Sequence, residues 1–184
     1  QKIVFQAGVA ILASLYCCFN GLTALYFPFT GASVDIGWGM LPLGIFVFIA
    51  AVNSVNLTDG LDGLAGSSCA VYFAAFAFLL MLQGGNKDLS LLCFCLTGAL
   101  AAYLVFNVSK ASVFMGDTGS LALGGFVACV SLFTGNGLIL PIVGVMFVLS
   151  SITVIIQVIY YKKTGKRVFL MAPVHHHFQE KGFS

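Results

Sequence analysis

Three polar segments interrupt this apolar chain, and they hold most of the residues that could do chemistry. The first is Asn56–Gly66, in which Asp59 and Asp62 are each followed directly by glycine and glycine recurs every third residue. Glycine lets backbone N–H groups approach a ligand closely, and carboxylates beside exposed amides could bind the donor groups of a base or a ribose. If the segment were helical, the two carboxylates would share one face. The alternative, which composition leaves equally open, is a flexible turn in which Asp62 caps the following helix.

The second polar segment, residues 107–120, contains a single carboxylate, Asp117, among glycines and hydroxyl residues just before an apolar run. Mg²⁺ is usually held by one or two carboxylates together with substrate phosphates, so Asp117 is a candidate Mg²⁺ ligand. A helix N-cap is the commoner role for such an aspartate when it is considered alone. Phe114 could stack on a base, although an aromatic side chain at the membrane interface is the commoner case.

The third polar segment, Met171–Gly182, contains the consecutive histidines His175, His176 and His177. Their internal position between Pro-Val and Phe-Gln argues against a purification tag. Adjacent residues on a helix lie about 100° apart, so three histidines in a row cannot easily converge on one metal ion. Hydrogen bonds from the imidazoles to phosphate and sugar groups are the better interpretation.

The elements that position these segments are predicted to cross a membrane. The chain is 60% hydrophobic and 8% charged, with a mean hydropathy of +1.05, whereas soluble domains carry about 25% charged residues. A net charge of +2 without a basic stripe gives no indication of nucleic-acid binding. The six cysteines lie within or beside apolar runs without a Cys-x-x-Cys pair, which excludes a disulfide framework or zinc site as the organising feature.

Apolar runs of nearly the length that a membrane span requires, about 20 residues, predict an all-α bundle of six spanning helices in a single domain, residues 1–184. The six runs are Ile3–Phe27, Gly39–Asn56, Leu64–Leu82, Leu89–Phe106, Ser120–Thr134 and Leu138–Tyr161. Alternation of the spans puts seven of the eight Lys and Arg residues on one side and leaves Lys87 on the other. This excess marks the first side as cytoplasmic. All three polar segments fall on that side.

Together, the three segments resemble the bacterial phospho-N-acetylmuramoyl-pentapeptide transferase family. The residues that carry the resemblance are 56–66, Phe114–Gly125 and Met171–Gly182. The uninterrupted run Pro173–Phe178 favours this branch over the sibling that uses UDP-N-acetylglucosamine, in which the histidine cluster is interrupted. The resemblance implies an Mg²⁺-dependent transfer at the cytoplasmic face of the bacterial inner membrane. Phospho-N-acetylmuramoyl-pentapeptide would pass from its UDP-activated form to undecaprenyl phosphate, giving lipid I and UMP for peptidoglycan synthesis.

The resemblance also assigns roles to individual residues. Asp117 would hold Mg²⁺ and, with the three histidines, form the catalytic set, while the histidines contact the nucleotide-sugar. The uridine portion would be held by Asp59, Gly60, Asp62 and Phe114. The full set of expected substrate-binding residues is Asn56, Asp59, Gly60, Asp62, Asn107, Phe114 and Gly116.

The resemblance covers the whole chain, but the chain does not cover the whole family. The six spans resemble the family's fourth to ninth, and the adjacent Asp-Asp pair that the family uses in catalysis does not occur. We therefore expect a fragment that is inactive alone. The alternatives are the sibling transferase, a non-catalytic scaffold, and a transporter, which should carry ionisable residues nearer the midplane. The expected partners are the two substrates and membrane lipid, without nucleic acid; a homodimer is left open.

Overall fold

The computed structural model describes residues 2–28, 30–108 and 110–182. Its elements in chain order are α1 (Lys2–Phe19), β1 (Ala24–Tyr26), β2 (Ser33–Asp35), the 3₁₀ turn η1 (Gly37–Gly39), α2 (Met40–Thr58), α3 (Leu64–Leu82), α4 (Lys87–Asn107), α5 (Gly116–Phe133), α6 (Leu140–Val143), α7 (Val145–Thr164) and α8 (Val174–Glu180). The two short strands form an antiparallel pair in which Leu25 lies opposite Val34.

Six of these helices are long and apolar enough to cross a membrane, which confirms the predicted all-α fold of a multi-pass membrane protein. They are α1, η1 with α2, α3, α4, α5 and α7. Apolar segments of this length form helices because a lipid environment offers no partner for unpaired backbone groups.

Three of the predicted spans were wrong at their ends, and a glycine explains two of the three. The first run stops at Phe19 instead of Phe27, because Gly21 adopts a φ of +68° and Leu22 N–H donates to the Cys17 carbonyl, which closes the helix. The sixth run is broken into α6 and α7 at Gly144, where an added Cβ would lie 2.8 Å from the Leu140 carbonyl oxygen. The fifth span begins at Gly116 rather than Ser120, which puts Asp117 inside its first turn.

Helix α2 is the centre of the bundle and packs against α1, α5 and α7, while α3 packs mainly against α4. At the α2–α5 contact, a Cβ on Gly124 would lie 2.6 Å from Val52 Cα, so the absent side chain lets the two backbones approach closely. The buried aromatic core is centred on α3, where the Tyr72 hydroxyl donates to the Val127 carbonyl of α5 at 3.1 Å. These contacts fix α5 against α2 and α3.

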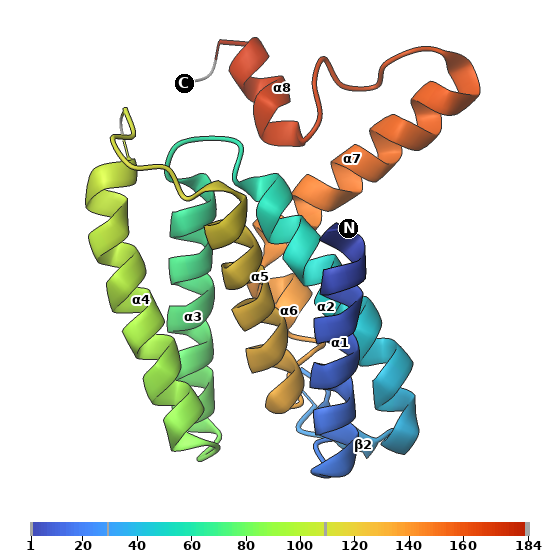
Figure 1. Cartoon of the computed structure of the whole chain (residues 1–184), viewed down its shortest axis with the longest axis vertical. Coiled ribbons are helices and arrows are strands. Elements are labelled where there is room, and N and C mark those ends of the chain that lie inside the picture. Colours follow the sequence, from blue (N-terminus) through green and yellow to red (C-terminus); the bar gives the residue numbers. More distant parts are fainter. Residues whose placement is uncertain (1, 29, 109, 183–184) are drawn as a thin grey trace.

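Figure 1 shows the ends of the helices sorted into two groups. The start of α1, the α2–α3 connection, the segment before α5 and α8 all lie at one end of the bundle, and the α3–α4 turn lies at the other. Helix α7, drawn in orange, leaves the bundle at an angle, and the chain then returns to place α8 over the first end. The three polar segments therefore share one end of the bundle.

Candidate functional site

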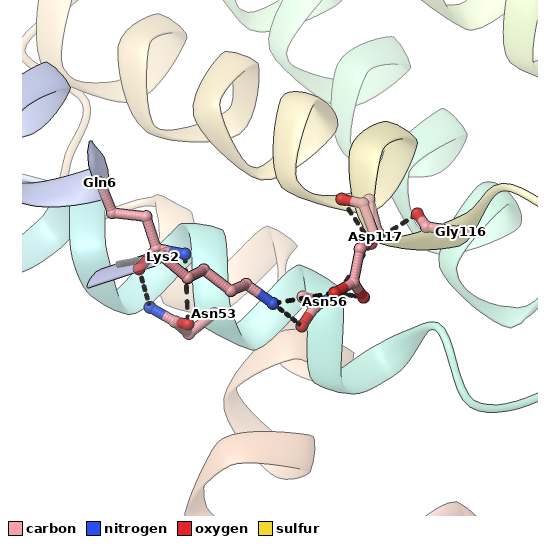
Figure 2. Close-up of polar contacts among 7 residues, drawn as sticks. Lys2, Gln6, Asn53, Asn56, Gly116 and Asp117 are labelled. Carbon is pink, nitrogen blue, oxygen red and sulfur yellow. Dashed lines mark hydrogen bonds and ion pairs between the residues drawn. The ribbon is translucent and has the colours of Figure 1, made fainter. Parts of the chain in front are cut away.

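Asp117 lies at the meeting point of three helices. In the first turn of α5 it does not cap the helix, because the N-cap position is Met115 and no side-chain cap bond is formed there. Instead, Asp117 Oδ1 accepts a hydrogen bond from Asn56 Nδ2 of α2 at 2.9 Å, and Oδ2 forms an ion pair with Lys2 Nζ of α1 at 3.2 Å (Figure 2). The Asp117 side chain remains 74% exposed, so the carboxylate can still be reached by a ligand.

Asn56 joins the three helices by using both ends of its amide. Its Nδ2 also donates to Ser120 Oγ at 2.9 Å, and its Oδ1 accepts from Lys2 Nζ at 3.1 Å. Lys2 is a residue of this site that sequence reasoning missed, because it was counted only as a charge that sets membrane orientation. The resulting cluster presents one carboxylate, one amide and one ammonium group at the end of the bundle (Figure 2).

A cavity of 220 Å³ lies beside this cluster, between the α2–α3 connection and the segment that enters α5. The cavity is lined by Asp59, Gly60, Leu61, Asp62, Asn107, Phe114, Met115 and Gly116. The structure thus brings six of the seven expected substrate-binding residues to one cavity, and the seventh, Asn56, contacts Asp117 instead. Phe114 is 73% exposed, which leaves its ring free to stack on a ligand.

The two carboxylates of the cavity do not share a helical face, because α2 ends at Thr58 and α3 begins only at Leu64. Asp62 also does not cap α3, whose N-cap is Gly63 at a φ of +76°; its Oδ2 accepts from Ala111 N–H at 3.0 Å. That bond ties the two walls of the cavity together. Burial of Asp59, reinforced by the nearby charge of Asp117, raises the pKa of the Asp59 carboxyl above its ordinary value.

Asn107 braces the cavity. Its Oδ1 accepts from Gly63 N–H at 2.9 Å and its Nδ2 donates to the Val113 carbonyl at 2.8 Å, with the side chain buried. The amide therefore connects the α2–α3 connection to the segment that precedes α5. Such backbone-directed bonds from an asparagine hold irregular chain segments in place.

Helix α8 brings two of the three histidines against the α2–α3 connection. A Cβ on Gly60 would lie 2.7 Å from Nε2 of both His175 and His176, so any other residue at this position would require the two imidazoles to shift. His175 is 7% exposed, and neither of its ring nitrogens has a hydrogen-bond partner among the described residues. Its burial, together with the neighbouring His176, lowers the pKa of His175 to about 4, so the ring is neutral at physiological pH.

The third histidine has a different environment. His177 Nδ1 accepts from Leu170 N–H at 3.1 Å, and its ring packs edge-on against Phe169. The segment before α8 is tied to α7 by Gln157, whose side chain accepts from Val168 N–H and Phe169 N–H at 3.1 and 2.9 Å. Gln157 is a second residue that sequence reasoning missed, since nothing in the local pattern sets it apart.

The arrangement fits a metal ion that is held partly by the protein and partly by the phosphates of a bound substrate. Among residues 2–28, 30–108 and 110–182, no three His, Cys, Asp or Glu side chains gather into a metal site. A single exposed carboxylate with an adjacent amide matches the way Mg²⁺ is shared between one or two protein carboxylates and substrate phosphates. Asp117 is therefore suited to a shared ion, with Asn56 able to orient it.

The amino-acid sequence of this chain is similar to those of known proteins. The sequence profile of the family described as Glycosyl transferase family 4 matches residues 1–135. The phospho-N-acetylmuramoyl-pentapeptide-transferase of Geobacillus sp. (strain WCH70) is 46% identical over 185 residues, an alignment that covers 100% of this chain and 57% of the relative. The protein of the same name from Bacillus subtilis (strain 168) is 42% identical with the same coverage. The chain thus spans 57% of the length of these curated relatives.

Proposed function

Since the chain belongs to glycosyl transferase family 4, we propose that its full-length protein transfers phospho-N-acetylmuramoyl-pentapeptide from its UDP-activated form to undecaprenyl phosphate. The products are lipid I and UMP, and the reaction serves peptidoglycan synthesis. The observation that carries the proposal is the cavity of 220 Å³ lined by Asp59, Asp62 and Phe114 directly beside Asp117. One end of this site suits a nucleoside and the other suits a diphosphate.

The cavity is the proposed uridine site. Its volume is below the range of about 300–1,000 Å³ that encloses a whole drug-sized ligand, so it suits one part of a nucleotide-sugar. Asp59 and Asp62 place carboxylate acceptors there for the N–H of a pyrimidine or for ribose hydroxyls. The exposed ring of Phe114 offers a face on which the base can stack.

The cluster of Asp117, Asn56 and Lys2 is the proposed diphosphate site. Asp117 would hold Mg²⁺, which when bound neutralises charge on the diphosphate. The Lys2 ammonium adds a second positive group within 3.2 Å of the same carboxylate. An oxygen of undecaprenyl phosphate attacks the sugar-linked phosphorus, the bond from that phosphorus to the uridylyl oxygen breaks, and UMP leaves. Because one phosphoanhydride replaces another, positioning and charge stabilisation supply the catalysis.

The histidines His175 and His176 border the cavity through Gly60 and are proposed to contact the sugar-phosphate side of the donor. We further propose that this end of the bundle faces the cytoplasm of the bacterial inner membrane. The support is the distribution of Lys and Arg. Seven of the eight are predicted to lie on the same side of the membrane as the three polar segments. A soluble nucleotide-sugar and the phosphate of a membrane lipid would meet there.

The test is UMP release by the purified full-length protein supplied with both substrates and Mg²⁺. We expect UMP to form with UDP-N-acetylmuramoyl-pentapeptide and to fall to background without undecaprenyl phosphate. Replacement of the donor by UDP-N-acetylglucosamine should give little product. Preferential use of UDP-N-acetylglucosamine would assign the protein to the sibling reaction, and no UMP from either donor would refute the proposal.

A further inference from the structure

A pair of side-chain amides links α1 to α2 one helical turn from the Asp117 cluster. Asn53 Nδ2 donates to Gln6 Oε1 at 3.0 Å, and Gln6 Nε2 donates to Asn53 Oδ1 at 3.4 Å (Figure 2). Gln6 is 8% exposed. Asn53 Nδ2 also donates to the Ile49 carbonyl of its own helix at 2.8 Å. Gln6 is therefore the amide that depends on the pairing, because an unpaired amide in an apolar environment is costly.

The spacing of these residues relates the pair to the proposed active site. Lys2 lies four residues before Gln6 on α1, and Asn56 lies three residues after Asn53 on α2. Residues three or four apart occupy the same face of a helix, so each amide sits directly beneath one member of the cluster. The bond between Lys2 Nζ and Asn56 Oδ1 is thus the next contact along the same α1–α2 interface.

This alignment needs to be held because Lys2 is poorly restrained by itself. Its side chain is 43% exposed, and lysine carries a flexible four-carbon stem. A shift of α1 along its axis by one residue moves the backbone by about 1.5 Å. Such a shift would separate the two amides and displace the base of the Lys2 side chain relative to Asp117 and Asn56, so the ammonium would spend less time in contact with the carboxylate.

We propose that Gln6 and Asn53 are positioning residues that set the register of α1 on α2 and thereby hold the Lys2 ammonium against the Asp117 carboxylate. The consequence for turnover rests on the proposed function, because it needs Lys2 and Asp117 to act on the donor diphosphate. The geometric part does not depend on the reaction. Loss of either amide should leave the fold in place and free the ammonium from the carboxylate.

The test uses a water-soluble carbodiimide, which activates a carboxylate and joins it to an amine in direct contact. In the purified protein we expect an isopeptide bond between Lys2 and Asp117, detected as a cross-linked peptide by mass spectrometry. The substitutions Gln6→Leu and Asn53→Leu should each lower its yield at least threefold. The exchange Gln6→Asn with Asn53→Gln preserves one long and one short amide and should restore at least half of the yield.

Ser14→Ala is the matched control. Ser14 is a buried polar residue of α1 that faces α2, where a Cβ on Gly44 would lie 2.5 Å from its Oγ, and it is far along the helix from Lys2. We expect its cross-link yield to equal that of the unaltered protein. Unchanged yield in folded Gln6→Leu and Asn53→Leu proteins, or an equal loss in Ser14→Ala, would overturn the proposal. Failure of the proposed function would appear separately, as an absence of UMP release with the cross-link intact.

Discussion

Replacement of Asp117 by asparagine separates a structural from a catalytic carboxylate. The structural loss is small, because the ion pair with Lys2 is largely exposed and such pairs contribute about 0–1 kcal/mol. Loss of a negative charge from the first helical turn costs about 0.3–1 kcal/mol more. For a chain of 184 residues we therefore expect the melting temperature to fall by only about 1–8 °C. Asparagine keeps the shape but lacks the charge that holds a hard cation.

The catalytic loss is expected to be far larger. UMP release by the full-length Asp117→Asn protein should fall by about a hundredfold or more, which corresponds to about 2.7 kcal/mol of transition-state stabilisation. Asp88→Asn is the matched control, because Asp88 also lies exposed in the first turn of a spanning helix, α4, at the opposite end of the bundle. It should show a similar thermal shift with normal turnover. Near-normal turnover of folded Asp117→Asn at limiting Mg²⁺ would refute the assignment of Asp117 as a metal ligand.

Three further results are expected from the same site. Mg²⁺ added before the carbodiimide should lower the yield of the Lys2–Asp117 cross-link in proportion to its occupancy, whereas equal ionic strength from NaCl should not. Gly60→Ala should weaken donor binding about tenfold or more, because its methyl group collides with the docked imidazoles, while Gly98→Ala, which has open space around it, should bind normally. Docking of α8 should weaken as the pH falls, because an undocked His175 takes up a proton near pH 6.5 and the docked ring only near pH 4. Between pH 7.5 and 5.5 the free energy of docking should fall by about 1.3 kcal/mol. Hydrogen exchange of the α8 amides measures this loss, which should be absent from His175→Gln. Unchanged protection would contradict the buried, neutral ring.

The spans could be predicted from the sequence because membrane helices are specified by length and apolarity alone. Residues 64–82 were placed correctly at both ends. Helix ends elsewhere depend on single residues that a hydropathy pattern averages away. Gly21 terminates α1 through its left-handed backbone, and Gly144 allows the break before α7, yet both lie inside apolar runs and look alike in the sequence.

The candidate site was predictable where its residues form local patterns and hidden where they do not. The aspartate–glycine repeat around Asp59 and the setting of Asp117 stand out in the sequence, and the structure brings both to one end of the bundle. Gln6, Asn53 and Gln157 are single polar residues in apolar runs, so only the tertiary contacts between helices reveal their partners. Asn107 was expected to bind substrate and does line the cavity; the sequence did not reveal that its amide also makes two backbone bonds that hold the cavity walls.

The cavity and the Asp117 cluster are electrostatically linked through Asp59. The charge of Asp117 adds to burial in raising the pKa of the Asp59 carboxyl, which shows that the two carboxylates interact across the site. A cation held by Asp117 would cancel that repulsion, so we expect the Asp59 pKa to fall and its carboxylate to become a stronger hydrogen-bond acceptor. Binding of a divalent ion should then favour binding of a nucleoside in the cavity. Because linkage is reciprocal, a bound nucleoside should raise the affinity of Asp117 for the ion by the same factor.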